Sequence, residues 1–210
     1  MIKKFKSLLL LSTLACVALL TASSASATLL TAKTNVDNGY QIYISTNDSV
    51  QGSSFGAGNN WGFTFTDTTS LNAGTDYFLH IYAYDQGGIA GFLGGFSLTG
   101  SDHAFYNTLT TLTSKTSNWN GNNSGWGAAN SPLVNLGVNS VGPWGFKSGV
   151  SSSANWIWAG DANSNDIAYF STKISAQTTV PEPASILLFG LGFLGLALMR
   201  KAKKASLPQM

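Results

Sequence analysis

The stretch TDYFLHIYAY, from Thr75 to Tyr84, decides the fold class of this chain. Side chains point alternately to the two sides of an extended strand, so the stretch divides into two faces. One face carries Tyr77, Leu79, Ile81 and Ala83, and the other carries Phe78, His80, Tyr82 and Tyr84. Such alternation, rich in aromatic and β-branched side chains, is typical of a β-strand.

Further strands are predicted on both sides of this stretch. GYQIYIS at residues 39–45 alternates in the same way, and so do Trp61, Phe63 and Phe65. Later strands are expected at residues 91–98, 154–159 and 167–174, with turn-forming residues at 37–39, 72–74 and 85–88. No segment of residues 28–179 shows a convincing helical period. The sequence therefore predicts an all-β domain there, a jelly-roll-like antiparallel β-sandwich.

The composition supports a packed domain and argues against nucleic acid as a partner. Charged residues make up 10% of the chain and aromatic residues 12%, whereas disordered chains are poor in aromatics. Residues 28–180 hold four lysines and eight aspartates, a formal net charge of −4. The few cations are scattered, and no basic stripe is interleaved with aromatics, as a nucleic-acid surface requires.

The N-terminal segment, residues 1–27, has the layout of a secretory signal peptide. A basic start precedes an apolar run from Leu8 to Leu20, and small residues end at Ala25 and Ala27. We therefore expect the general secretion machinery to export the chain and cleavage to follow Ala27. The alternative, a retained membrane helix, is weaker because the run is shorter than the ~20 residues that span a bilayer. Cys16, the single cysteine of the chain, leaves with this segment.

The C-terminal segment, residues 180–204, has three parts in a fixed order. Pro181, Glu182 and Pro183 come first, an apolar run from Ala184 to Met199 follows, and a basic cluster ends the segment: Arg200, Lys201, Lys203 and Lys204. The run gives a helix of ~24 Å at ~1.5 Å per residue, marginal for a hydrocarbon core of ~30 Å. The basic cluster predicts that residues 205–210 form a short cytoplasmic tail and that the preceding domain lies outside.

This tripartite segment resembles the PEP-CTERM sorting signal of Gram-negative bacteria. In that family the signal is read by exosortase, a membrane transpeptidase-like enzyme. The resemblance implies that the helix is a transient anchor, that it is removed, and that the domain passes to the cell surface or the extracellular matrix. The alternative is a plain C-terminal membrane anchor.

Residues 35–174 resemble galactose-binding-type jelly rolls. The resemblance rests on Asp37-Asn38 before an aromatic strand, on Trp61 after a Gly-Asn loop, on Ala73-Gly74 and on Gly88-Ile89-Ala90-Gly91. Trp119, Trp126, the Trp156-Ile157-Trp158 strand and Tyr169-Phe170 continue the order. The chain departs from the pattern at Thr46-Asn47-Asp48 and at Ser171, so the fold is better supported than a sugar site.

Little in the sequence points to catalysis, and we predict that the protein is not an enzyme. Residues 52–56 match the G-x-S-x-G nucleophile elbow, which requires a strand before it and a helix after it, but they lie in a polar loop. His80 sits in an aromatic strand, where it is expected to be a core or surface packing residue rather than a base, and the pair Asp102-His103 lacks a third partner. No paired Cys/His spacing predicts zinc.

One group of oxygen-bearing residues raises the hypothesis of a weak structural calcium site. Asp161, Asn163 and Asn165 match the first positions of an EF-hand loop, and Asp166 follows them. Thr172 stands where the bidentate glutamate would be, so this is no EF-hand. The alternative is a hairpin turn, since Asn and Asp dominate turns. No other cofactor is expected.

The tryptophans supply the candidate ligand contacts. Trp119, Trp126 and Trp144 lie among Asn, Gly and Ser, where loops are expected and where exposed rings could stack on sugars. The alternative is that these loops fold back and seal the ends of the sandwich with the rings. Trp61 and either Trp156 or Trp158 are expected in the core.

Three functions follow from these features. The first is a surface or matrix protein of the exopolysaccharide layer that binds polysaccharide through its aromatic loops. The second is a purely structural or adhesive matrix protein without a specific ligand. The third, a secreted hydrolase, is disfavoured because no acid/base or nucleophile constellation is present.

Overall fold

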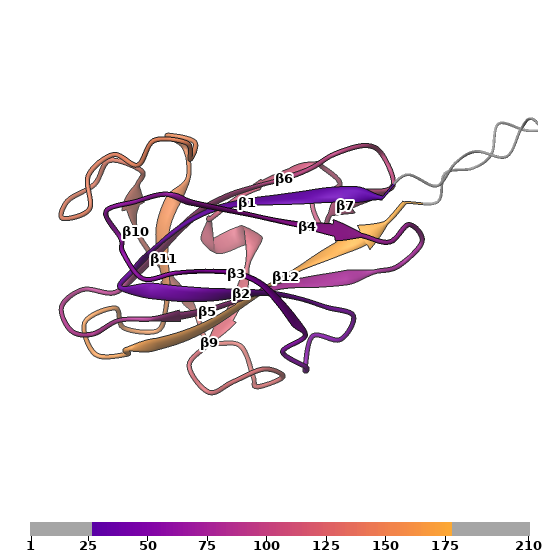
Figure 1. Cartoon of the computed structure of the whole chain (residues 1–210). Helices are drawn as coiled ribbons and strands as arrows, with labels where there is room; N and C mark the ends of the chain where they lie inside the picture. The colour runs from indigo at the N-terminus through magenta and orange to yellow at the C-terminus, as the bar shows by residue number, and fades with distance from the viewer. Residues whose placement is uncertain (1–26, 178–210) are drawn as a thin grey trace, which may run out of the picture. The chain divides into compact units, whose positions relative to one another are not determined.

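Two antiparallel sheets of six strands each build the domain (Figure 1). The computed structural model describes residues 27–177, which belong to one compact unit of the chain. In the first sheet the order is β10 (Leu133–Val138), β11 (Asn155–Ala159), β6 (Gly91–Leu98), β1 (Thr28–Asp37) and β4 (Phe65–Leu71), with β8 (Thr111–Thr113) also on β6. This sheet therefore contains the first strand of the domain, β1, together with the late strands β10 and β11.

In the second sheet the order is β3 (Ser53–Gly58), β2 (Gly39–Ser45), β5 (Tyr77–Tyr84), β12 (Ile167–Ala176) and β7 (His103–Phe105), with β9 (Asn120–Asn122) also on β12. A short 3₁₀ turn, η1 (Thr116–Asn118), precedes β9. The strand pairs of both sheets are antiparallel, which confirms the predicted all-β class.

The stretch that predicted the fold lies at the centre of the second sheet. Ile81 of β5 is the register partner of Ile42 in β2 and of Phe170 in β12. The alternation is as predicted, because Leu79, Ile81 and Ala83 are fully buried between the sheets. His80 on the opposite face is also fully buried because the ring of Trp126 stacks on it, which simple alternation does not predict.

Most predicted strands are confirmed, and one is wrong. β2, β5, β6, β11 and β12 lie where the alternation placed them. Trp61 to Phe65 does not form a strand: β4 begins only at Phe65. Asn60 explains the difference, since its side-chain oxygen accepts a hydrogen bond from Gly62 N at 2.8 Å and its carbonyl accepts one from Phe63 N at 3.2 Å. These bonds hold a turn instead.

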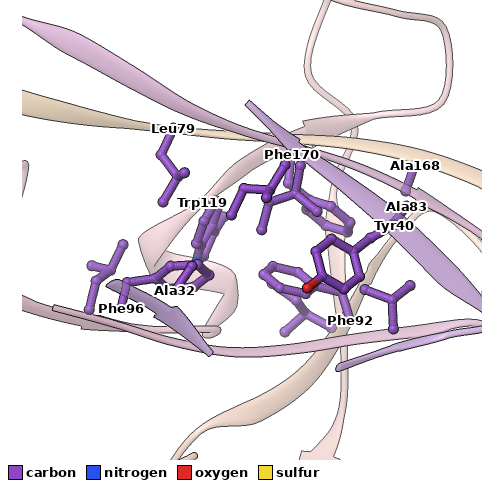
Figure 2. Close-up of a cluster of buried hydrophobic side chains, with 14 of the residues drawn as sticks. Ala32, Tyr40, Leu79, Ala83, Phe92, Phe96, Trp119, Ala168 and Phe170 are labelled. Carbon is purple, nitrogen blue, oxygen red and sulfur yellow. The ribbon is translucent and has the colours of Figure 1, made fainter. Parts of the chain in front are cut away.

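The core between the sheets is rich in aromatic rings (Figure 2). Phe92 of the first sheet and Phe170 of the second have ring centroids 4.9 Å apart, so the two sheets pack directly on each other. Figure 2 shows Trp119, from the loop before β9, among these side chains. Its ring meets Phe92 edge-on with centroids 5.3 Å apart and lies 5.1 Å from Phe96.

A second, smaller cluster is built on a tryptophan pair. Trp144 and Trp156 stack with centroids 4.4 Å apart and an interplanar angle of 18°. Gly91 permits this, because a Cβ there would lie 2.8 Å from Trp144 and 2.9 Å from Trp156. Both clusters and both sheets lie within residues 27–177, so we expect this segment to fold by itself.

The predictions for the two ends of the chain mostly concern residues outside the described range. The signal peptide, the sorting segment at 180–204 and the tail at 205–210 lie there, except Ala27, which is exposed just before β1. Within residues 27–177 no helix is long and apolar enough to cross a membrane.

Candidate functional site

The three tryptophans predicted to contact glycan have different environments. Trp119 and Trp144 are only 5% and 4% exposed, so neither ring offers a face to a sugar. Trp119 fills the main core, and Trp144 stacks on Trp156 in the second cluster while its Nε1 donates to Asp37 Oδ2 at 2.8 Å. The burial of these two rings favours the alternative that their loops fold back. Trp126 alone of the three remains partly exposed.

Trp126 lies on the outer face of the second sheet. Its ring stacks on His80 of β5, with centroids 4.3 Å apart and an interplanar angle of 13°. It also meets Tyr169 of β12 edge-on at 4.9 Å and Tyr43 of β2 at 6.2 Å. Three strands therefore support this one ring, and the ring in turn contributes to the burial of His80.

Polar contacts hold His80 from its other sides. Its Nε2 lies 3.0 Å from Asp48 Oδ1, and its Nδ1 lies 3.3 Å from the carbonyl oxygen of Gln51. Both ring nitrogens are thereby engaged in positioning the loop between β2 and β3. His80 is a support for Trp126, in agreement with the prediction that it is a packing residue.

A small cavity, here called the Trp126 pocket, opens beside this ring. It has a volume of about 160 Å³, and its walls come from the β2–β3 loop, β9, the β9–β10 loop and β12. The lining side chains that bear polar atoms are Asp48, Ser49, Asn120, Asn122, Trp126, Asn130, Tyr169 and Ser171. Carboxylate, amide and hydroxyl groups are thus gathered around one aromatic ring.

The loop that carries Trp126 is fixed at both ends. Asn122 Oδ1 accepts hydrogen bonds from Ser124 N at 2.8 Å and Gly125 N at 3.0 Å. Gly127 has φ +78°, and a Cβ there would lie 2.8 Å from the Ser49 side chain, so glycine permits the close approach of the two loops. The pocket is therefore largely formed before any ligand arrives.

The proposed calcium residues form a hydrogen-bonded turn. Asp161 accepts from Asn163 N at 3.0 Å and from Ser164 Oγ at 3.1 Å, and these bonds hold the pKa of Asp161 below its usual value. Asn165 and Asp166 use their carbonyl oxygens, which accept from Trp158 Nε1 and Asp85 N. Within the described range no three acidic, His or Cys residues are grouped as metal ligands. Calcium binding stays a prediction.

The residues weighed for catalysis have structural surroundings. Ser54 lies in β3, and the next element is strand β4, so the helix that a nucleophile elbow needs is not there. His103 is fully buried, with Nδ1 2.9 Å from Thr28 Oγ1 and Nε2 3.0 Å from the carbonyl oxygen of Thr75. These contacts tie β7 to the start of β1 and to the turn before β5.

Sequence reasoning missed a second cavity, near the turn at Trp61. Trp61 was expected in the core but is 38% exposed, because the turn held by Asn60 carries it outward. The cavity has a volume of about 340 Å³ and is lined by Lys33, Gly62, Phe63, Thr64, Thr66, Phe146, Lys147, Ser148 and Gly149. The Gly-Asn-Asn stretch before Trp61 was the available signal, since such residues predict a turn.

Comparison with known families places the chain among exported, sorted proteins. The family model described as the PEP-CTERM protein-sorting motif matches residues 179–201. The chain therefore carries a PEP-CTERM sorting motif, as the order of Pro181-Glu182-Pro183, apolar run and basic cluster predicted. The motif implies exosortase as the processing partner and a cell-envelope or extracellular destination in a Gram-negative bacterium. Neither the curated proteins nor the solved structures gave a significant match.

Proposed function

We propose that the protein is a surface or extracellular-matrix component that holds a neutral glycan in the Trp126 pocket. One observation carries this proposal: a supported aromatic ring lies beside amide, hydroxyl and carboxylate groups on the outer face of the second sheet. Sugar recognition needs both kinds of group, a ring for the apolar face of the sugar and polar atoms for its hydroxyls. The jelly-roll likeness is consistent with this role.

The size of the pocket fits a short ligand segment. At about 160 Å³ it is smaller than the ~300 Å³ at which sites for drug-sized ligands begin, so it suits a single sugar ring of a longer chain. The stacking on His80 fixes the Trp126 ring in advance, which lowers the entropy lost on binding.

The test is a glycan array followed by titration of the best neutral oligosaccharide. Because an aromatic–sugar stack and its hydrogen bonds contribute a few kcal/mol, we expect Trp126→Ala to weaken binding by about tenfold or more. Asn130→Ala, at an exposed position of the pocket wall, should also weaken binding without affecting folding. Tyr106→Ala is the matched control, an aromatic that is 46% exposed elsewhere. Unchanged binding in both pocket variants would show that the pocket is not the glycan site.

The sorting proposal concerns the fate of the C-terminal segment. We propose that the apolar run is a transient membrane anchor, that cleavage near Pro181 to Pro183 releases the domain, and that the basic cluster after it stays inside. Replacement of Pro181, Glu182 and Pro183 by alanine should leave full-length protein in the membrane fraction. If that variant is processed and displayed like the parent, the segment acts only as an anchor.

The non-enzymatic role also remains a proposal with its own test. Residues 27–177 should release no reducing ends from a panel of polysaccharides over long incubation. Release that disappears in the Ser54→Ala or Asp48→Asn variant would instead support a hydrolase. A domain that binds no glycan and cleaves none would favour the purely structural matrix role.

A further inference from the structure

The cavity missed by sequence reasoning, here called the lysine cavity, is separate from the Trp126 pocket. The two share no lining residue. Its volume of about 340 Å³ lies within the range of ~300–1,000 Å³ that is typical of ligand sites. Its walls come from β1, from β4 and the turn before it, and from the loop between β10 and β11.

The walls of the lysine cavity are joined by specific hydrogen bonds. Thr64 Oγ1 donates to the carbonyl oxygen of Ser148 at 2.8 Å, which links the turn to the loop. Asn139 is only 1% exposed, and it accepts from Lys147 N at 2.8 Å and donates to Lys147 O at 2.9 Å and Val150 O at 3.0 Å. Such a buried amide fixes the loop around Lys147, so the cavity is preformed.

Large aromatic side chains stand exposed at this cavity. Phe63 and Phe146, which line it, are 66% and 63% exposed. The Lys147 ammonium lies 4.6 Å from the centroid of the Trp61 ring, which is itself 38% exposed. Clustered exposed apolar groups mark interaction sites, because leaving them in water is unfavourable.

The charge at this cavity is opposite to that of the domain as a whole. Residues 28–180 carry a net charge of −4, yet two of their four lysines, Lys33 and Lys147, line this one cavity. Within residues 27–177 neither has a carboxylate within 4.0 Å, whereas Lys173 is paired with Asp76 at 2.7 Å. Lys147 is only 7% exposed, and this burial lowers its pKa, while the more distant charge of Asp37 acts in the opposite direction. An anion in the cavity would supply a counter-charge at contact distance, which no carboxylate in the described part of the chain provides within 4.0 Å.

We propose that the lysine cavity binds an acidic sugar residue of an anionic polysaccharide. The carboxylate of this sugar lies between the ammonium groups of Lys33 and Lys147, and the sugar ring packs against Phe63 and Phe146. The hydroxyls of Thr64 and Ser148 also line the cavity and can bond the ring hydroxyls, Thr64 as an acceptor because its proton is given to the Ser148 carbonyl oxygen. A concave site with hydroxyls in its wall fits a sugar better than a membrane surface, which requires a protruding apolar face. This site does not depend on the Trp126 pocket.

The proposal is tested by titrating residues 27–177 with oligoguluronate, a carboxylated sugar chain, and with neutral dextran of equal length. We expect binding of oligoguluronate and not of dextran, weakened as salt rises from ~0.05 to ~0.5 M. Lys33→Gln and Lys147→Gln should each reduce the affinity by about tenfold, since each removes one charge-assisted hydrogen bond. Lys115→Gln is the matched control, and both it and Trp126→Ala should bind like the parent.

Two results would overturn the proposal. The first is unchanged oligoguluronate binding in Lys33→Gln and in Phe146→Ala. Neither variant removes a fully buried side chain, so both should fold and test the proposal even if Lys147→Gln fails to fold. The second is the absence of oligoguluronate binding by the parent protein. If that protein instead co-sediments with vesicles of equal parts phosphatidylglycerol and phosphatidylcholine, the aromatic residues form a membrane-contacting surface.

Discussion

Trp119 and Trp126 stand on either side of β9 and have similar neighbours in the sequence, yet they occupy opposite environments. Trp119 enters the core between the sheets, and Trp126 lies outside the second sheet, where it forms the wall of a pocket. The three-residue strand between them pairs with β12. The pairing of one short strand, rather than the composition of the loops, therefore decides which ring stabilises the fold and which remains available to a ligand.

The largest effect is expected from removing the inner ring. Trp119→Ala deletes a side chain that contacts Phe92 and Phe96, and such deletions of buried aromatics cost about 3–5 kcal/mol. Urea unfolding of residues 27–177 measures this. A loss of unfolding free energy below about 1 kcal/mol would mean that the core packs without Trp119, and Trp119 would then stabilise the fold no more than Trp126 does.

The second expected effect concerns the smaller cluster. Gly91→Ala places a methyl group less than 3.0 Å from both Trp144 and Trp156. Overpacking of this kind typically costs about 1–3 kcal/mol. Gly95→Ala in the same strand is the matched control, because its nearest neighbour would be 3.7 Å away. Equal stability of the two variants would show that the stacked tryptophans rearrange at little cost in free energy.

A smaller effect on stability is expected from the outer ring. Trp126→Ala should lower the free energy of unfolding by about 0.5–1.5 kcal/mol, because it removes aromatic contacts at the surface rather than in the core. Thermal melting compares this variant with Trp119→Ala. A cost as large as that of Trp119→Ala would mean that Trp126 is a structural residue first.

The smallest effect is a dependence of stability on pH. Burial lowers the pKa of Lys147 below its ordinary value of 10.5, so the unfolded chain binds this proton more tightly than the folded one. Stability from this group therefore rises with pH between the lowered pKa and 10.5. In Lys147→Met this rise should be missing when melting is compared with the parent from neutral to alkaline pH. The same dependence of the melting temperature on pH in Lys147→Met and in the parent would show that Lys147 is not the group responsible.

The strands that alternate strongly could be predicted, whereas β1 was missed together with the short or polar strands β3, β4, β7, β8, β9 and β10. β5 and β2 place large apolar residues on one face and were found from the sequence. β1, which lies between β6 and the edge strand β4 in the first sheet, buries Ala32, Thr34 and Asn35, so small and polar residues weaken its pattern. Its burial depends on strands β4 and β6, which are distant in sequence.

The candidate sites were predictable only in part. Trp126 was identified because an aromatic among amides suggests a sugar contact, but the same signal also selected Trp119 and Trp144, which are buried. The lysine cavity was missed because Lys33 and Lys147 are far apart in sequence and meet only through the fold. The alternation of Trp61, Phe63 and Phe65 indicated a strand, whereas the bonds of Asn60 produce a turn.

The position of β12 has a consequence for the timing of export. β12 is the last strand of the domain, yet it lies inside the second sheet and pairs with β5, β7 and β9. A chain that crosses the membrane from its N-terminus presents β12 last, and its final strand residue, Ala176, stands just before the sorting motif at residue 179. The domain can close its second sheet only when the motif has reached the membrane. Completion of folding and presentation of the motif therefore coincide, and the cleavage proposed above would act on a domain that has all its strands available to close.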